Sequence, residues 1–200
     1  MSDGARIVRI AHGDLTSALL AQIDDVFFEA SGRTFLSAPE REAFRERWLG
    51  RYLQGGTDVV LLALDQVGGV AGYLLGALQD PAEQERFADI RYFRTDFREL
   101  CRHYPAHLHV NLAAAFRSRG LGARLIATFG TCAAEARVPG MHVVTGRAAR
   151  NVSFYVRCGF VELGSSQWNG REVVFLAKGL GTPAIKREGI VGEHKSARLR

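Results

Sequence analysis

The feature that most constrains this chain is the segment 107–130, HLHVNLAAAFRSRGLGARLIATFG, where a strand-like stretch meets a helical one across a glycine-bearing turn. Residues 107–112 have the composition of a strand, and the apolar spacing over 121–136 predicts a helix. Glycines in the turn, 117–122, let the backbone bend tightly and approach a ligand closely. The helix N-terminus adds unpaired N–H groups and a partial positive charge, so the join is suited to a pyrophosphate.

Other interpretations of this turn also have to be weighed. Strand-to-helix turns often carry glycine for packing alone, so two glycines do not by themselves identify a ligand. The chain has no GxxxxGK[ST] motif, and the GxGxxG spacing of dinucleotide folds is absent. Arg117, Arg119 and Arg124 place positive charge in and beside the turn. The pattern therefore favours a phosphate-bearing ligand whose class the turn alone leaves open.

The first part of the chain has the periodicity of helices. Apolar residues at helical spacing predict a helix over 15–29, with Asp14 placed to accept the free N–H groups of its first turn. A second helix is expected over 39–53, because a proline favours the first helical position and Gly55-Gly56 would end the helix.

Strand signals follow. The apolar runs 58–64 and 70–78 predict a β-hairpin. The segment 81–104 is expected to form one or two helices with an aromatic face, which either covers the core or lines an acceptor pocket.

The last part of the chain continues this alternation. We expect a strand over 141–145, a short helix over 151–157, and a closing hairpin of 161–163 and 172–177 across the Asn169-Gly170 turn. Helices and strands thus alternate in a mixed order, which indicates an α/β or α+β domain built on a single sheet.

Two motifs resemble one known family. The turn, Arg-x-x-Gly-x-Gly followed by Ala123, resembles the R/Q-x-x-G-x-G/A signature of GNAT acetyltransferases. The segment 151–160, NVSFYVRCGF, is similar to the late helix of that family, which ends in F-Y-x-x-x-G-F, although Ala148 stands where the family has an earlier asparagine. The resemblance covers roughly 5–180. It implies an α/β (α+β) fold with a single mixed, mostly antiparallel sheet flanked by helices, in which a splay between two strands holds acyl-CoA.

A narrower resemblance concerns the stretch YPAHLHVNLAAAFRSRGLG. It is similar to a bacterial subgroup related to the acetyltransferase-like domain of some O-GlcNAc hydrolases, which often read YPAHLHIDLLPE before the loop. Asn111 stands at the aspartate position of that pattern and Ala114 at the common proline position. Asn111 cannot ionise, so no base is assigned to it.

The resemblance implies roles for particular residues. Backbone groups of Val110 and Leu112 would bind pantetheine as an added strand would, in the wedge between 107–112 and 141–145. Loop N–H groups would hold the pyrophosphate, supported by the charge of Arg117 and Arg119, and Asn151 would cap or orient the loop or the cofactor. The expected loop residues are Ser118, Arg119, Gly120, Leu121, Gly122 and Ala123.

Proton transfer is expected to involve Tyr155 and a histidine. Tyr155 matches the tyrosine that many family members use to protonate the departing CoA thiolate, and the alternative is that it only packs and bonds the cofactor sulfur. His107, His109 and Asn111 alternate along one strand and so share a face. His109 is the candidate base, against the alternative of a buried structural histidine. No metal is expected, because His103 and the two strand histidines have no fourth ligand at suitable spacing.

The charge distribution argues against a nucleic-acid binder. The formal net charge is +5, but residues 181–200 carry five basic and two acidic side chains, which leaves +2 for residues 1–180. We therefore expect one domain over 1–180 and a flexible basic tail over 181–200. No apolar run approaches the length of a membrane span, and the first residues lack a signal-peptide core, so the expected location is the cytoplasm without membrane attachment.

The sequence thus predicts an enzyme that transfers the acetyl group of acetyl-CoA, as a co-substrate, to a primary amine of a small molecule or peptide. The alternative is an inactive module of the same fold that binds acyl-CoA or a regulatory partner. Many relatives dimerise, so a homodimer is expected. The residues proposed for the acceptor pocket are Arg33, Tyr73, Tyr92 and Phe93.

Overall fold

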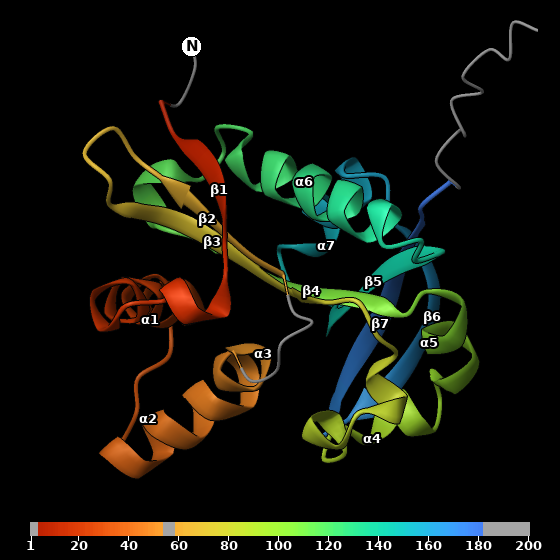
Figure 1. Ribbon diagram of the computed structural model, residues 1–200. Coiled ribbons are helices and arrows are strands. Elements are labelled where there is room, and N and C mark those ends of the chain that lie inside the picture. Colours follow the sequence, from red (N-terminus) through yellow and green to blue (C-terminus); the bar gives the residue numbers. More distant parts are fainter. Residues whose placement is uncertain (1–3, 54–58, 182–200) are drawn as a thin grey trace, which may run out of the picture.

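A mixed sheet forms the centre of the molecule (Figure 1). The computed structural model describes residues 4–53 and 59–181, and within them seven strands follow the order β1-β2-β3-β4-β5-β7-β6. Neighbouring strands are antiparallel except for the parallel pair β4 and β5. The strands are β1 (Arg6–Ile10), β2 (Val59–Leu64), β3 (Val70–Ala77), β4 (Ala106–Leu112), β5 (Gly140–Gly146), β6 (Val161–Trp168) and β7 (Arg171–Gly179).

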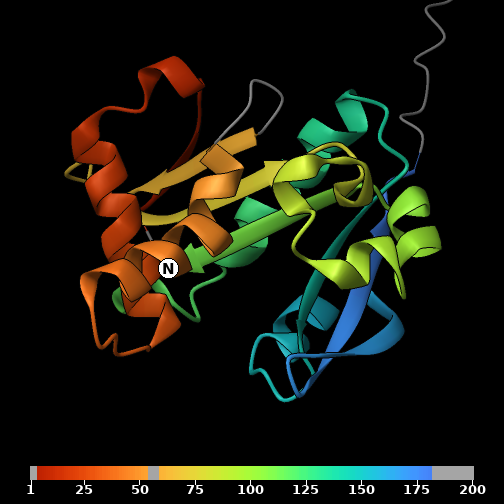
Figure 2. The same ribbon diagram turned by 90° about the horizontal axis from the view of Figure 1, so that it is seen from below.

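Helices cover both faces of the sheet (Figures 1 and 2). One face is covered by α6 and α7, and the other by α1–α3 on one half and by the segment 81–104 on the other half. A wider π-type turn, Glu46–Gly50, joins α2 to α3. The helices are α1 (Ser17–Ser31), α2 (Ala38–Arg45), α3 (Arg51–Leu53), α4 (Arg91–Arg94), α5 (Arg98–His103), α6 (Leu121–Glu135) and α7 (Val152–Arg157).

Side chains of strand β2 pack against the helices on both faces of the sheet. All six of its side chains are buried, and they alternate between the two faces. Leu61 packs in the cluster that contains α6, whereas Leu62 packs in the cluster that contains α1. A strand covered on both faces has no solvent side, so its sequence is a continuous apolar run instead of an alternating one.

The segment 81–104 forms two short 3-10 turns, Pro81–Glu83 and Glu85–Phe87, followed by α4 and α5. Part of its aromatic face covers the core, as one of the two predicted alternatives has it. Phe97 packs against Phe175 of β7, and Cys101 belongs to the same buried cluster, the third in the molecule. Other aromatic residues of the same segment line the cavity described below.

Several predicted elements are confirmed and others need correction. The hairpins and α6 lie where they were predicted, and Asn169 and Gly170 both have positive φ (49° and 72°), as a type I′ hairpin turn requires. The predicted cap Asp14 is wrong, because this residue lies in a 3-10 turn and the N-cap of α1 is Thr16, whose hydroxyl accepts from the Leu19 N–H at 3.2 Å.

Two strands differ from the prediction. β1 was not predicted, and β6 extends to Trp168 instead of ending at residue 163. The predicted helix stop at Gly55-Gly56 and the tail expected over 181–200 fall outside the described residues, except for Gly181. Over 4–53 and 59–181, the structure contains no helix with both the length and the apolar character that a membrane span needs.

Candidate active site

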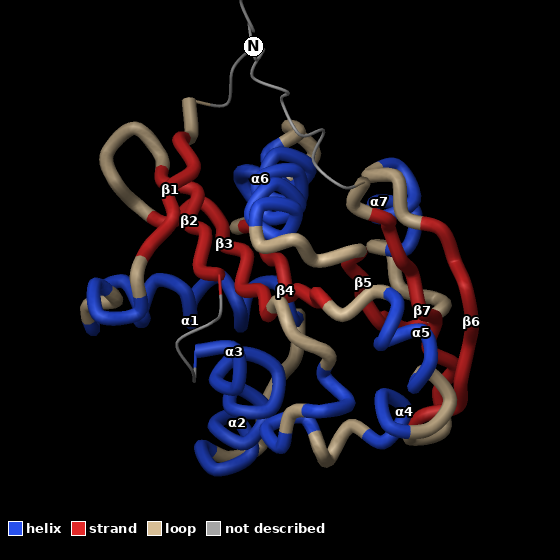
Figure 3. The backbone as a smooth tube through the Cα atoms, turned by 45° about the vertical axis from the view of Figure 1, so that its right-hand side comes forward, coloured by secondary structure: helices blue, strands red, loops and turns tan. Residues whose placement is uncertain are grey.

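The sheet opens between β4 and β5 (Figure 3). These strands pair only at Ala106↔Met141 and His107↔His142. Beyond that point β4 pairs only with β3 as far as Leu112, and β5 pairs only with β7 as far as Gly146. The facing edges from residues 108 and 143 onward therefore have backbone groups without a strand partner, and an extended ligand can bind such an edge as a strand would. Val110 and Leu112, predicted to bind pantetheine, lie on this edge.

The glycine turn lies at the wide end of the wedge. Gly120 is the N-cap of α6 with φ 83°, and Ser118 also has positive φ (60°). The first N–H of the helix with a backbone partner is that of Arg124, which bonds to the Gly120 carbonyl at 3.1 Å. Among the described residues, the N–H groups of 118–123 have no backbone hydrogen bond. They form the cluster of donors that binds an anion at a helix start.

The two glycines of the turn have different roles. A Cβ built on Gly120 meets nothing within 4 Å, so the space before the loop is open to a ligand. A Cβ on Gly122 would lie 3.1 Å from the Phe154 ring, so this glycine lets α6 pack closely against α7. Open space, free donors and a positive helix end together fit a pyrophosphate.

The arginines near the turn are arranged in three ways. Arg117 is half-buried and donates from Nε to the Leu112 carbonyl at 2.9 Å, which fixes the turn against the end of β4. Arg124 donates to the Ala5 carbonyl at 3.0 Å, next to β1. Arg119 is exposed. Arg117 is therefore the arginine that the fold places against the strand edge.

Helix α7 brings Tyr155 and Asn151 to the α6 side of the wedge. Tyr155 is buried in one cluster with Leu108 and Val143, the first residues past the paired part of β4 and β5. Burial raises the pKa of its phenol well above 10, so the phenol is protonated at neutral pH. Asn151 accepts a hydrogen bond from Thr145 Oγ1 at 3.0 Å, which ties the start of α7 to the splayed end of β5.

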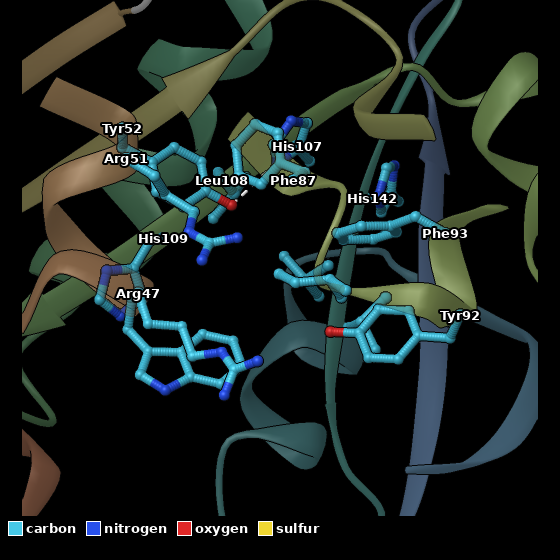
Figure 4. Close-up of a pocket in the computed structure, with 14 residues that line it drawn as sticks. Arg47, Arg51, Tyr52, Phe87, Tyr92, Phe93, His107, Leu108, His109 and His142 are labelled. Atoms are coloured by element: carbon cyan, nitrogen blue, oxygen red, sulfur yellow. Dashed lines mark hydrogen bonds between the residues drawn. The ribbon is translucent and has the colours of Figure 1, made fainter. Parts of the chain in front are cut away.

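A cavity of about 70 Å³ opens on the other face of the sheet, between the π-type turn with α3 and the segment 81–104 (Figure 4). Figure 4 shows Arg47, Arg51 and Tyr52 on one side, and Tyr92, Phe93 and His142 on the opposite side. Leu108 and Val143 also line the cavity, so it reaches the wedge between the strands. The full lining is Arg47, Trp48, Arg51, Tyr52, Phe87, Ile90, Tyr92, Phe93, His107, Leu108, His109, His142, Val143 and Val144.

Three histidines meet at this cavity, and each has a buried ring nitrogen without a partner among the described residues. Nδ1 of His142 donates to the Tyr104 carbonyl, so in the neutral ring Nε2 carries a free lone pair. Nδ1 of His107 lies 2.9 Å from the Tyr52 hydroxyl, which leaves Nε2 unpartnered. Nε2 of His109 lies 3.4 Å from the side-chain nitrogen of Asn111, which leaves Nδ1 unpartnered.

These imidazoles are neutral at working pH. Burial lowers the pKa of His109 and of His142 to about 4. Burial also lowers the pKa of His107, and the charges of His142 and Arg86 add to that effect. A buried neutral imidazole with a free nitrogen can accept a proton or a hydrogen bond from a bound ligand.

Two arginines of the cavity share one carboxylate. Arg51 donates to Asp89 at 2.8 Å and is only 8% exposed, and Arg47 binds the same carboxylate at 2.8 Å. The hydrogen bond from Arg51 is the main reason that the pKa of Asp89 is lowered, so this group is ionised. Arg51 Nε is buried and has no partner in the described part of the chain.

The structure places only some of the residues predicted for the acceptor pocket at this cavity. His109, Tyr92 and Phe93 line the cavity. Tyr73 does not line it but accepts a hydrogen bond from Asn111 at 2.8 Å. Arg33 does not line this cavity, and its guanidinium lies over the Phe44 ring.

Sequence reasoning missed Arg47, Arg51 and His142. A polar His142 in the apolar stretch MHVV was a usable signal. A second usable signal was the spacing of Arg47 and Arg51, which are four residues apart and so lie on one helical face. In the described ranges, no three or more His, Cys, Asp or Glu side chains are arranged to hold a metal ion.

Comparison with solved structures shows which fold this is. No protein-family model matches the chain. Its structure is similar to that of SsHAT, with a TM-score of 0.65 and 20% identity over 88% of this chain and 98% of that one. It is also similar to a GCN5-related N-acetyltransferase from Kribbella flavida, with a TM-score of 0.61 and 16% identity over 90% and 100% of the two chains.

A third similar structure is the GNAT phosphinothricin acetyltransferase from Sinorhizobium meliloti, determined in complex with AcCoA. Its TM-score is 0.54, with 17% identity over 89% of each chain. The narrower resemblance to domains of O-GlcNAc hydrolases stays a prediction. The seven-stranded mixed sheet, splayed between β4 and β5 and flanked by helices, is the fold of the GNAT acetyltransferases.

Proposed function

We propose that this protein transfers the acetyl group of acetyl-CoA to a primary amine. The observation that carries the proposal is the wedge between β4 and β5, which joins two binding features. At its wide end lies the turn 117–122 with free N–H groups. At its narrow end Leu108 and Val143 border both the cluster that contains Tyr155 and the cavity on the other face. A ligand in the wedge could thus reach the acceptor through the sheet.

The residues of the chain that would hold acetyl-CoA follow from this arrangement. N–H groups of 118–123 would bind the pyrophosphate, and the free edge of β4 at Val110 and Leu112 would bind the pantetheine. Asn151, fixed by Thr145, would keep α7 beside the splayed end of β5. Bound acetyl-CoA supplies an activated thioester, and positioning that thioester beside the amine supplies much of the rate.

Proton transfers in the proposed reaction are assigned to side chains on the two faces. The ammonium first loses one proton, then the amine nitrogen bonds to the acetyl carbonyl carbon and the carbon–sulfur bond breaks. The nitrogen loses a second proton, which balances the proton that the departing sulfur takes up. Tyr155 is the proposed donor to the departing sulfur, since its raised pKa keeps the phenol protonated. An imidazole of the cavity accepts the proton from the ammonium. His109 is the proposed base, and it would accept the proton on Nε2, the nitrogen that now faces the Asn111 amide group. His142 is the second candidate, because its Nε2 has a free lone pair.

Thermal unfolding with and without acetyl-CoA tests the cofactor site. A ligand at 100 times its Kd stabilises by about 2.7 kcal/mol, which raises the Tm of a domain of this size by about 5–10 °C. Gly120→Glu should abolish this shift, because its carboxylate would enter the open space before the loop. Gly68→Glu is the matched control, since Gly68 also has positive φ (88°) and open space but lies in the β2–β3 turn.

Release of CoA thiol with a panel of amines tests turnover. A shift that acetyl-CoA produces in wild type and in Gly68→Glu, together with amine-dependent thiol release, would support the enzyme. A shift without release for any amine would instead support a module that binds acyl-CoA without catalysis. No shift with any acyl-CoA would refute the proposed cofactor.

A further inference from the structure

The cavity has an unusual balance of charge. Among the described residues that line it, two are arginines, three are histidines and none is an aspartate or glutamate. An ammonium group that enters this cavity meets no carboxylate to balance its charge. A simple cationic amine is therefore repelled by Arg47 and Arg51 unless it brings an anion of its own.

The positive charges of Arg47 and Arg51 are only partly balanced by acidic side chains. Asp89 is a single carboxylate between two guanidiniums, so Arg47, Arg51 and Asp89 together carry a net charge of +1. Arg51 is buried and its Nε has no partner among the described residues, which is costly for a charged group. A second carboxylate, supplied by a ligand, would balance the charge. Planar guanidinium groups bind carboxylates with charge-assisted hydrogen bonds.

Size sets a second limit on the acceptor. A cavity of about 70 Å³ has room for only a few non-hydrogen atoms, since one water needs roughly 10–15 Å³. A second, more polar hollow of about 450 Å³ adjoins it, and Arg47 and Tyr92 border both. The amine end can thus enter the small cavity while the rest of a small molecule lies in the hollow.

We infer that the acceptor is an amino acid, a zwitterion whose carboxylate pairs with Arg47 and Arg51 while its amine faces the wedge between β4 and β5. This inference rests on the proposed acetyl transfer. It also explains how the ammonium is tolerated, because carboxylate and ammonium enter the cavity together and the neutral histidines then take only the departing proton.

Matched acceptors test the inference directly. L-Amino acids such as leucine, phenylalanine and glutamate are compared with their α-amides and with the amines that lack the carboxyl group. We expect kcat/KM to favour the free amino acids by about 10- to 100-fold, the usual value of a charge-assisted contact. Higher kcat/KM for the amides, for polyamines or for peptides with a free N-terminus would overturn the inference.

Variants assign the preference to the arginines. Arg47→Gln and Arg51→Gln should bring the ratio of acid to amide close to one, and Arg51→Lys should retain part of it. Arg102→Gln, on the exposed side of α5, should leave the ratio unchanged. Each variant is first checked for an unchanged Tm shift with acetyl-CoA. An unchanged ratio in the folded Arg47 and Arg51 variants would contradict the assignment.

A binding assay separates this inference from the proposed function. N-acetyl amino acids, with CoA present, should raise the Tm more than their α-amides, and Arg47→Gln should remove the difference. This readout needs no turnover. If acetyl-CoA does not raise the Tm of the wild-type protein, but N-acetyl amino acids still raise it more than their α-amides do, the proposed function alone is refuted. A retained acetyl-CoA shift with no preference for the acid in either assay would refute the inference alone.

Discussion

Acidification should destabilise the protein through His142. This histidine is fully buried, its ring stacks on Phe175 with centroids 4.4 Å apart, and the His107 ring lies 5.6 Å away. Burial lowers the pKa of His142 from 6.5 to about 4. The unfolded chain therefore binds a proton at a higher pH than the folded chain does. Stability consequently falls as the pH falls from about 6.5 to about 4, and is unaffected by this group above that interval.

The magnitude follows from the two pKa values. A difference of about 2.5 pKa units corresponds to about 3 kcal/mol once the pH is below both values. About 2 kcal/mol of this loss of unfolding free energy occurs between about pH 7.5 and about pH 5. His142→Asn removes the titrating group, and its side-chain amide can still donate to the Tyr104 carbonyl. The variant is expected to be less stable than wild type at neutral pH but less sensitive to acid.

Urea unfolding at a series of pH values measures this effect. The quantity of interest is the loss of unfolding free energy from about pH 7.5 to about pH 5, which should be about 2 kcal/mol smaller in His142→Asn than in wild type. His103→Asn is the control, since His103 is exposed on α5. Equal losses in wild type and His142→Asn would refute the reasoning, whatever the absolute stability of the variant.

Two further variants test the site and the core. Tyr155→Phe should lower kcat by about 100-fold or more while keeping the acetyl-CoA shift in Tm, as measured by thiol release and thermal unfolding; an unchanged kcat would exclude Tyr155 as the proton donor. Gly76→Ala should cost about 1–3 kcal/mol in urea unfolding, because its Cβ would lie 2.2 Å from the Phe129 ring of α6. Gly179→Ala, a strand glycine with nothing within 4 Å of the added Cβ, should cost less; equal costs would contradict the packing argument.

Much of the fold could be predicted because local patterns determined it. The glycine turn, the buried apolar run of β2 and the period of α6 each carry one dominant signal. Where two local signals competed, the prediction failed. Asp14 and Thr16 are both good caps, and the choice between them depended on where the chain leaves the turn His12–Asp14. β6 was predicted too short because its exposed edge, VELGSSQW, lacks a sustained apolar face.

The candidate site was harder to predict because its parts come from distant segments. His107 and His142 meet only because β4 and β5 pair at their first residues. Arg51 meets Asp89 across 38 positions of sequence, and no spacing rule predicts that contact. The turn at the wide end of the wedge could be located from the sequence, because one contiguous segment forms it. The cavity depends on tertiary packing, so only isolated members of its lining were predicted.

The short contact between β4 and β5 also has a mechanical consequence. The sheet consists of two parts, β1–β4 and β5–β7. Their backbones are joined only by the short pairing of β4 with β5, and the two strands diverge beyond it. The cavity is lined by His107 and His109 from the first part of the sheet, and by His142 and Val144 from the second part. The width of the cavity therefore depends on the angle between the two parts of the sheet. A ligand that fills the gap at the wide end would therefore also fix the distance between the walls of the cavity.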